Sequence, residues 1–97
     1  MELVSIKKDD NGKNKMVAVF EDKATGKTKT THFGAVGYTD YTLSKDKAKR
    51  KLYLARHKPR ENWDDYTSAG SLSANILWGD STSIQENIKA FKKKFKL

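Results

Sequence analysis

Short apolar or β-branched runs separated by turn residues occupy the first third of the chain, a pattern typical of β-strands joined by tight turns. It predicts strands over residues 3–6, 16–20 and 27–33. Asn11-Gly12 and Thr25-Gly26 lie between these strands and supply the positive φ values of tight turns. The apolar run 16–20 is expected at the centre of the sheet, and the Thr- and Lys-rich run 27–33 at its edge. A three-stranded antiparallel meander is therefore predicted.

The periodicity changes after a loop predicted over residues 34–42, and a helix is expected to begin at Leu43-Ser44. Ser44 would be its N-cap, with Asp46 in the first turn, where the helix dipole favours an anion. Pro59 is expected to stop the helix, because the residue before a proline avoids the helical region. One narrow apolar stripe would face the core, formed by Ala48, Leu52 and Ala55.

The segment 69–78 fits either a strand or a short helix. We favour a helix, because Thr67 or Ser68 can cap its start and Gly79 can end it. The connector before it is expected to be ordered by Trp63.

The last helix has the clearest pattern in the chain. Ser83 and Glu86 are spaced as a capping box. Four apolar residues then repeat along one helical face, at Ile84, Ile88, Phe91 and Phe95. This face is expected to be buried.

Together these elements predict an α+β fold in a single domain, an N-terminal antiparallel meander packed against two or three C-terminal helices. The two parts are expected over residues 1–33 and 34–97. In the core, the last helix would meet Val17, Val19 or their neighbours in the sheet. Trp63 and Trp78 would close one end of the core.

Composition narrows the class of protein. The 97 residues include ten aromatics, which argues against disorder despite 36% hydrophobic and 33% charged residues. The chain has no Cys, so neither a disulfide nor a thiolate zinc site is expected. It shows no signal-peptide pattern and no apolar run long enough to cross a membrane. A soluble intracellular protein that does not contact membranes is therefore expected.

The net charge of +8 is unevenly distributed along the chain. Residues 44–60 carry eight Lys or Arg and one acid, whereas residues 61–88 carry five acids and no Lys or Arg. Five Lys follow in residues 89–97, where cations complement the dipole at the end of a helix. A basic segment with so few acids favours a polyanionic partner, because ordinary solvated helices interleave both signs.

The predicted contacts to nucleic acid, DNA or RNA, are the phosphate-binding residues Lys45, Lys49, Arg50, Arg56 and Lys58. About five such contacts predict a log–log salt slope of about −4 to −5 on duplex DNA. The simpler interpretation is a solvated helix face that maintains solubility. Intramolecular pairing is a further alternative, in which Arg56 or Arg60 would meet Asp64 or Asp65 across the bend at Pro59.

No catalytic, metal or cofactor motif is predicted. His32, His57 and Asp40 invite a metal-dependent nuclease hypothesis, yet their spacing matches no metal-ligand signature. The structural interpretation is that His32 closes a strand and Asp40 caps a turn. Tyr38 and Tyr41 are candidates for stacking on bases if they are exposed.

A set of short motifs occurs at fixed offsets through the segment 32–95: His32-Phe33-Gly34, Gly37-Tyr38, Asp40-Tyr41-Thr42, Lys45-Asp46, Arg50-Lys51, Tyr53, Arg56-His57, Trp63, Asp65, Ala69-Gly70, Ser73 and Leu77-Trp78. In these motifs the segment resembles a family of small uncharacterised proteins encoded by large nucleocytoplasmic DNA viruses of algae and amoebae. The chain departs from the family pattern at Ser71-Leu72, where the family has aromatic bulk. The resemblance implies a viral origin and a place in the virion or the virus factory, but no reaction.

The leading functional hypothesis is a non-enzymatic viral accessory protein that binds nucleic acid through the basic helix. The alternative is a minor structural or protein-interaction component of a virion. In that case another viral protein would be the partner, and the acidic segment 61–88 would contribute to the contact. The host cytoplasm, the virus factory or the virion is the expected location.

Overall fold

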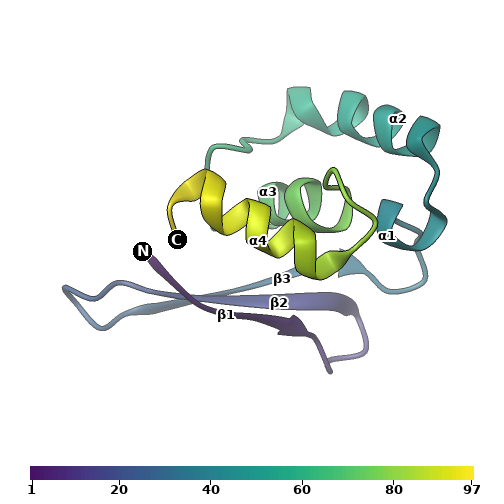
Figure 1. Ribbon diagram of the computed structural model, residues 1–97. Helices are drawn as coiled ribbons and strands as arrows, with labels where there is room; N and C mark the ends of the chain where they lie inside the picture. The colour runs from purple at the N-terminus through teal and green to yellow at the C-terminus, as the bar shows by residue number, and fades with distance from the viewer.

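The computed structural model describes all residues, Met1–Leu97, and begins with a three-stranded antiparallel sheet. Its strands are β1 (Glu2–Lys8), β2 (Asn14–Glu21) and β3 (Thr28–Ala35), in the order β1-β2-β3 (Figure 1). The predicted meander is thus confirmed, with the most apolar strand at the centre. β3 is longer than expected and takes in the first residues of the predicted loop.

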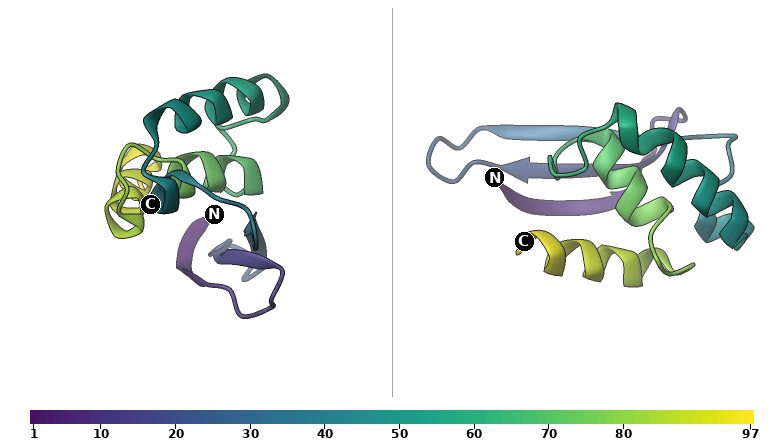
Figure 2. Two further views of the ribbon diagram at one scale, coloured as in Figure 1. Left: turned by 90° about the vertical axis from the view of Figure 1, so that its right-hand side faces the viewer. Right: turned by 90° about the horizontal axis from the view of Figure 1, so that it is seen from above.

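The helices that follow form two layers on one side of the sheet, so the predicted α+β class is confirmed. α3 (Ala69–Leu72) runs into a π-helical turn, η2 (Ser73–Leu77), and lies with α4 (Ile84–Phe95) over the sheet. α1 (Tyr41–Ser44) leads into α2 (Lys47–His57), which continues as a 3-10 turn, η1 (Lys58–Arg60). Figure 2 shows α2 as the outermost layer, with α3 and α4 between it and the sheet. No helix is long and apolar enough to span a membrane.

The core lies between the sheet and the layer of α3, η2 and α4. Fully buried side chains from both sides include Phe20, Phe33, Leu72, Ile76 and Phe91. The apolar face of α4 packs inward as predicted, with Phe91 buried and its other members packed against the core.

The sheet presents a different set of residues to the core from the one expected. Met16, Ala18 and Phe20 belong to the core cluster, whereas Val17 and Val19 do not. Successive side chains of a strand point to opposite faces, so the alternation that buries Ala18 turns both valines away from the helices. Of the predicted set, the neighbours of the two valines thus face the helices, while Val17 is buried outside the core cluster with 8% of its surface exposed.

α2 also turns a different face inward. The predicted stripe is wrong: Ala48, Leu52 and Ala55 are exposed, and Leu52 retains 57% of its accessible surface. The half-buried residues of α2 are instead Arg50, Tyr53, Leu54 and His57. α2 lies on other helices rather than on the sheet, and long side chains make that contact. The small apolar residues at helical spacing therefore lie on the solvent face of α2.

The start of α2 is corrected as well. Ser44 ends α1 and is not the N-cap of the long helix. Lys45 then adopts a left-handed conformation with φ 56°. Asp46 caps α2 by accepting hydrogen bonds from the backbone N–H groups of Ala48 (2.9 Å) and Lys49 (3.2 Å).

The predicted helix over 69–78 is confirmed, with Ser68 as its N-cap. It ends in a wider π turn, in which the Trp78 N–H donates to the Ser73 carbonyl at 3.0 Å. Gly79 follows where no side chain fits, because a Cβ there would lie 2.3 Å from the Asn75 carbonyl oxygen.

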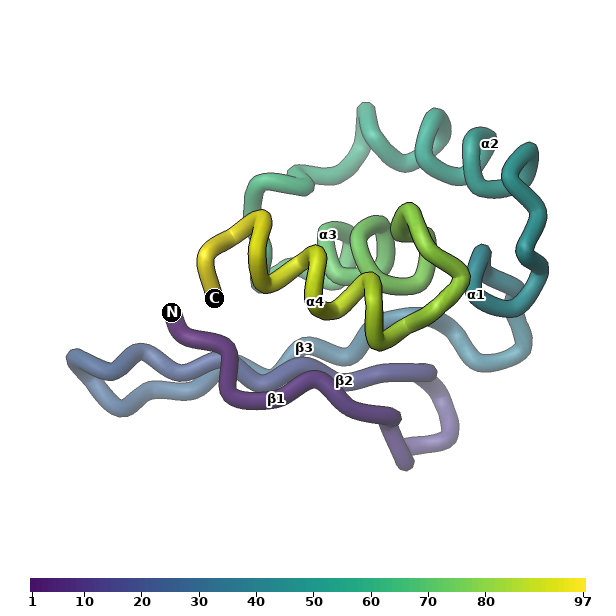
Figure 3. Tube along the Cα trace, viewed as in Figure 1, coloured from purple at the N-terminus to yellow at the C-terminus, as the bar shows by residue number.

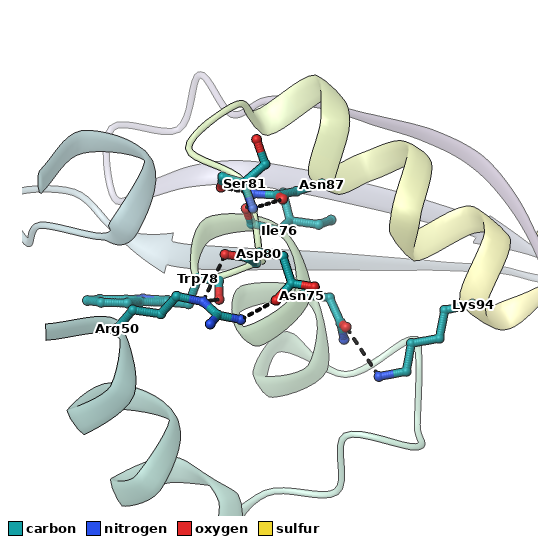
Figure 4. Close-up of polar contacts among 9 residues, drawn as sticks. Arg50, Asn75, Ile76, Trp78, Asp80, Ser81, Asn87 and Lys94 are labelled. Atoms are coloured by element: carbon teal, nitrogen blue, oxygen red, sulfur yellow. Dashed lines mark hydrogen bonds and ion pairs between the residues drawn. The ribbon is translucent and has the colours of Figure 1, made fainter. Parts of the chain in front are cut away.

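The loop from this turn to α4 is held by a buried side chain that the sequence did not single out, Asn87. Its amide group donates to the carbonyls of Ile76 (2.8 Å) and Ser81 (2.7 Å) and accepts from the Ser81 N–H (2.9 Å) (Figure 4). Only half of the predicted capping box forms. Ser83 accepts from the Glu86 N–H, but the Ser83 N–H donates to Ser81 Oγ.

The two ends of the chain lie close together at one end of the molecule (Figure 3). There the amino group of Met1 donates a hydrogen bond to the Tyr66 hydroxyl at 2.8 Å, and the Met1 carbonyl accepts from the same hydroxyl at 2.7 Å. Tyr66 also packs its ring against Phe20 and Phe95. The first strand is thereby fastened to the connector and to the end of α4.

The orientation of α2 can be tested with two leucines on the same helix. We expect Leu54→Ala to lower the free energy of unfolding by about 1–2 kcal/mol, because Leu54 packs against the core. The matched variant Leu52→Ala should change it by less than about 0.5 kcal/mol. Urea denaturation followed by circular dichroism measures both. The reverse ranking would mean that the originally predicted stripe faces inward.

Candidate nucleic-acid interface

α2 and the residues next to it carry an unneutralised basic surface. It consists of seven exposed residues that form no ion pair with a carboxylate: Lys45, Lys47, Lys49, Lys51, Arg56, Lys58 and Arg60. We call this set the basic surface. It contains four of the five predicted phosphate contacts.

Helical spacing divides the basic surface into two flanks. Residues 49, 52, 53 and 56 repeat at i, i+3, i+4 and i+7 and so share one face. Lys49 and Arg56 therefore lie on the same side of α2, next to Tyr53. Lys47 and Lys51 follow the same kind of spacing on the opposite flank, whereas Lys45, Lys58 and Arg60 lie beyond the two ends of α2.

Arg50, the fifth predicted contact, points into the molecule instead. Its Nε donates to the carbonyl oxygens of Trp78 (3.0 Å) and Gly79 (2.9 Å), and a terminal nitrogen donates to Asp80 at 2.7 Å (Figure 4). The guanidinium also lies 5.7 Å from the centre of the Tyr41 ring. Its donors are thus used to attach α2 to the loop after η2, and we remove Arg50 from the set of phosphate contacts.

The acidic segment does not neutralise the basic surface. The expected pairs of Arg56 or Arg60 with Asp64 or Asp65 do not form. Asp65 instead accepts hydrogen bonds from the N–H (3.1 Å) and hydroxyl (2.7 Å) of Thr67, which hold the pKa of its carboxyl below the usual 3.8.

Glu61 likewise contacts residues outside the basic surface. Its carboxylate accepts from the Trp63 indole N–H at 2.9 Å and lies 3.2 Å from His57 Nδ1. Trp63 is only half-buried and is absent from the core cluster, so it does not close the core as predicted. It orders the connector through this hydrogen bond and through its carbonyl, which accepts from the Ser71 hydroxyl at 2.9 Å.

Three rings form a stack between α2 and η2. His57 lies 4.0 Å from Tyr53, and Tyr53 lies 4.1 Å from Trp78 with the planes only 4° apart, both measured between ring centres. Burial of the Tyr53 hydroxyl, reinforced by the Glu61 carboxylate, raises its pKa to about 12. The sequence signal for the stack is the i, i+4 spacing of Tyr53 and His57.

The two stacking candidates lie in different environments. Tyr38 is 75% exposed, in the turn between β3 and α1. Tyr41 is 5% exposed and belongs to the core cluster beneath Arg50. Only Tyr38 is accessible to a base.

The residues of the nuclease hypothesis do not form a metal-ligating cluster. His32 lies within β3 rather than at its end, and its Nδ1 is 2.5 Å from Asp9, a contact that lowers the pKa of Asp9 below its usual value of 3.8. Asp40 is 2% exposed, binds Lys15 at 2.6 Å and caps α1 as predicted. No group of three or more metal-ligating side chains gathers anywhere in the structure.

Comparison with known proteins identifies a family but no activity. A family model described as "Family of unknown function (DUF5754)" matches residues 4–57, more than half of the chain. The match runs from β1 to the end of α2, and it therefore includes most of the basic surface. No curated protein and no solved structure matches the chain. The viral origin implied by the resemblance of residues 32–95 stays a prediction.

The anchoring role of Arg50 can be separated from charge alone. We expect Arg50→Gln to lower the free energy of unfolding by about 1–3 kcal/mol, because the carbonyl oxygens of Trp78 and Gly79 and the Asp80 carboxylate lose a charged donor. Lys51→Gln removes the same charge from an exposed neighbour and should cost less than about 0.5 kcal/mol. Chemical denaturation of both variants gives the comparison, and equal losses would refute the anchoring role.

The pKa of Tyr53 predicts how stability depends on pH. The pKa of Tyr53 rises on folding from the usual 10.0 to about 12, so folding favours the protonated phenol. This contribution is fully present below about pH 10 and is lost as the pH rises towards about 12. Stability of the wild type should therefore fall more steeply over this range than that of Tyr53→Phe. Urea titrations across the alkaline range measure both proteins, and parallel curves would show that Tyr53 ionises normally.

Proposed function

Because this chain belongs to the DUF5754 family, whose function is unknown, we propose a function from its own surface: it binds nucleic acid through phosphate contacts of α2 and its flanking residues. The proposed role is that of a non-enzymatic accessory protein. A viral setting is part of the proposal and rests on the resemblance of residues 32–95 alone.

The observation that carries the proposal is the lack of any carboxylate partner for the seven residues of the basic surface. Like charges at neighbouring helical positions repel one another, which makes an unpaired basic helix unfavourable by itself. A polyanion relieves this repulsion and releases its own counterions on binding. The arrangement therefore supports a phosphate backbone as the partner.

Within the basic surface, the proposed phosphate contacts are Lys45, Lys49, Arg56 and Lys58. All four are exposed and free of ion pairs. Contacts to phosphate carry no sequence information. We therefore expect binding without strong preference for a particular sequence.

The alternative, a protein-interaction component that uses the acidic segment, has less support. Three of the five acids in residues 61–88 already have partners within the chain: Glu61, Asp65 and Asp80. These contacts order the connector and fasten α2. They leave few carboxylates for another copy or another protein.

Binding should weaken with salt in proportion to the number of phosphate contacts. Four contacts predict a log–log slope of about −3.6 on duplex DNA and about −2.8 on a single strand. Fluorescence anisotropy with labelled DNA and RNA over a salt series measures this slope. The absence of binding at low salt, or binding that is independent of salt, would exclude the proposal.

Variants on the two flanks provide a matched control. Lys49→Gln combined with Arg56→Gln should reduce the duplex slope to about −1.8, because two contacts are lost. Lys47→Gln combined with Lys51→Gln removes the same charge from the opposite flank and should change the slope by less than about half a unit. If both pairs weaken binding equally, the interaction follows net charge and no defined contact set exists.

A further inference from the structure

A cleft opens beside the flank of α2 that carries Lys49 and Arg56. It has a volume of about 530 Å³ and lies between the turn after β3 and the aromatic stack. Its lining includes Tyr38 from the turn and Tyr53, His57 and Trp78 from the stack. A smaller hollow of about 260 Å³ adjoins it and shares Tyr53, Arg56, His57 and Trp78 with it. We call the two together the aromatic cleft. Its main volume is within the range of about 300–1,000 Å³ typical of small-ligand sites.

The stacked wall of the cleft is held in place before any ligand arrives. The stack of His57, Tyr53 and Trp78 is fixed at both ends, by Glu61 on His57 and by Arg50 on the Trp78 carbonyl. Fixed rings lose little conformational entropy when a planar ligand binds.

The lining of the cleft also contains an aromatic ring that is largely free of packing. Tyr38 is 75% exposed, in a turn that is hydrogen-bonded to the first hairpin. Gly37 takes a φ of 92°, and the Val36 N–H donates to the Lys13 carbonyl at 3.0 Å. The turn is thus tied to the hairpin while its tyrosine faces water. An exposed ring of this kind is a stacking platform for any nucleobase, because every base has a π face.

The charges of the aromatic cleft select an anionic ligand. Its only carboxylate is Asp40, which is already bound by Lys15. Arg56 lines both parts of the cleft, and Lys49 lines the smaller one; neither has a carboxylate partner. Aromatic walls with free cations at their edge match a flat ring attached to a phosphate.

We propose that the aromatic cleft binds one unpaired nucleobase of a single-stranded nucleic acid, stacked on Tyr38, with Arg56 and Lys49 on its adjacent phosphates. The inference rests on the proposed function and deepens it, since it makes single-stranded nucleic acid the preferred ligand. A base inside a duplex is already stacked on both faces and cannot enter the cleft without being flipped out.

The stacking contact is tested by comparing Tyr38→Ala with Tyr38→Phe in the full chain. The probes are a labelled oligothymidylate, a labelled oligouridylate and a labelled duplex. Tyr38→Ala should weaken single-strand binding about 5- to 150-fold, the range seen when a base-stacking aromatic is truncated to alanine. Tyr38→Phe keeps the ring and should bind like the wild type. Val36→Ala, an exposed neighbour in the same turn, should also leave binding unchanged.

A second readout follows Trp78 directly. In a Trp63→Phe background Trp78 is the only tryptophan. Its fluorescence should change on addition of the single strands and remain constant with the duplex, because only an unpaired base reaches the cleft. Thymidine monophosphate is the fourth probe and serves as an unlabelled competitor. Displacement of the oligothymidylate by the free nucleotide at similar concentrations would overturn the proposal in favour of a mononucleotide site.

The outcomes separate the two proposals. If Tyr38→Ala leaves single-strand affinity unchanged while the Lys49 and Arg56 double variant weakens it, the cleft proposal fails and phosphate binding stands. Equal loss of single-strand and duplex binding in Tyr38→Ala also contradicts the cleft. If the wild type binds none of the strands at low salt, both proposals fail.

Discussion

The position of the basic helix depends above all on its contacts with Trp78 and Gly79. α2 has no fully buried residue and does not pack on the sheet. It is held by the Tyr53 ring stacked on Trp78, by the Arg50 guanidinium on two carbonyls, and by Leu54 packed against the core. The loop that offers these carbonyls is fixed in turn by Asn87, whose side-chain amide is fully hydrogen-bonded below it. The arrangement of the basic surface on α2 therefore depends on the contacts with Trp78 and Gly79.

The same arrangement explains why one helix can carry so many cations. A helix that packs directly on a sheet must give a wide stripe of its surface to apolar residues. α2 gives only a narrow face to its neighbours, and that face is made of long or aromatic side chains. The remaining positions are free for Lys and Arg. Concentrating charge here therefore costs the core little, since no buried member of the core cluster lies on α2.

The elements themselves were predictable from the sequence, whereas the face that α2 turns inward was not. The meander followed from the β-branched runs and the Asn11-Gly12 turn, and α4 from four apolar residues at helical spacing. For α2 two residue sets with identical spacing competed, and only the tertiary contact decides between Leu52 and Leu54. Within the candidate site, exposure of the lysines was foreseeable from their number. The use of Arg50 was not, because a sequence cannot show that backbone carbonyls lie within reach of a guanidinium.

The π turn at Ser73–Leu77 makes the position of α2 sensitive to changes in chain length. A π turn holds one residue more than an α-helical turn, and each residue rotates a helix by about 100°. Deleting one residue of η2 would leave a regular helix, yet it would swing Trp78 about a quarter of a turn away from Tyr53. Homologues that differ in length at this point are thus expected to carry a different outer helix, even if their sheets and cores superimpose.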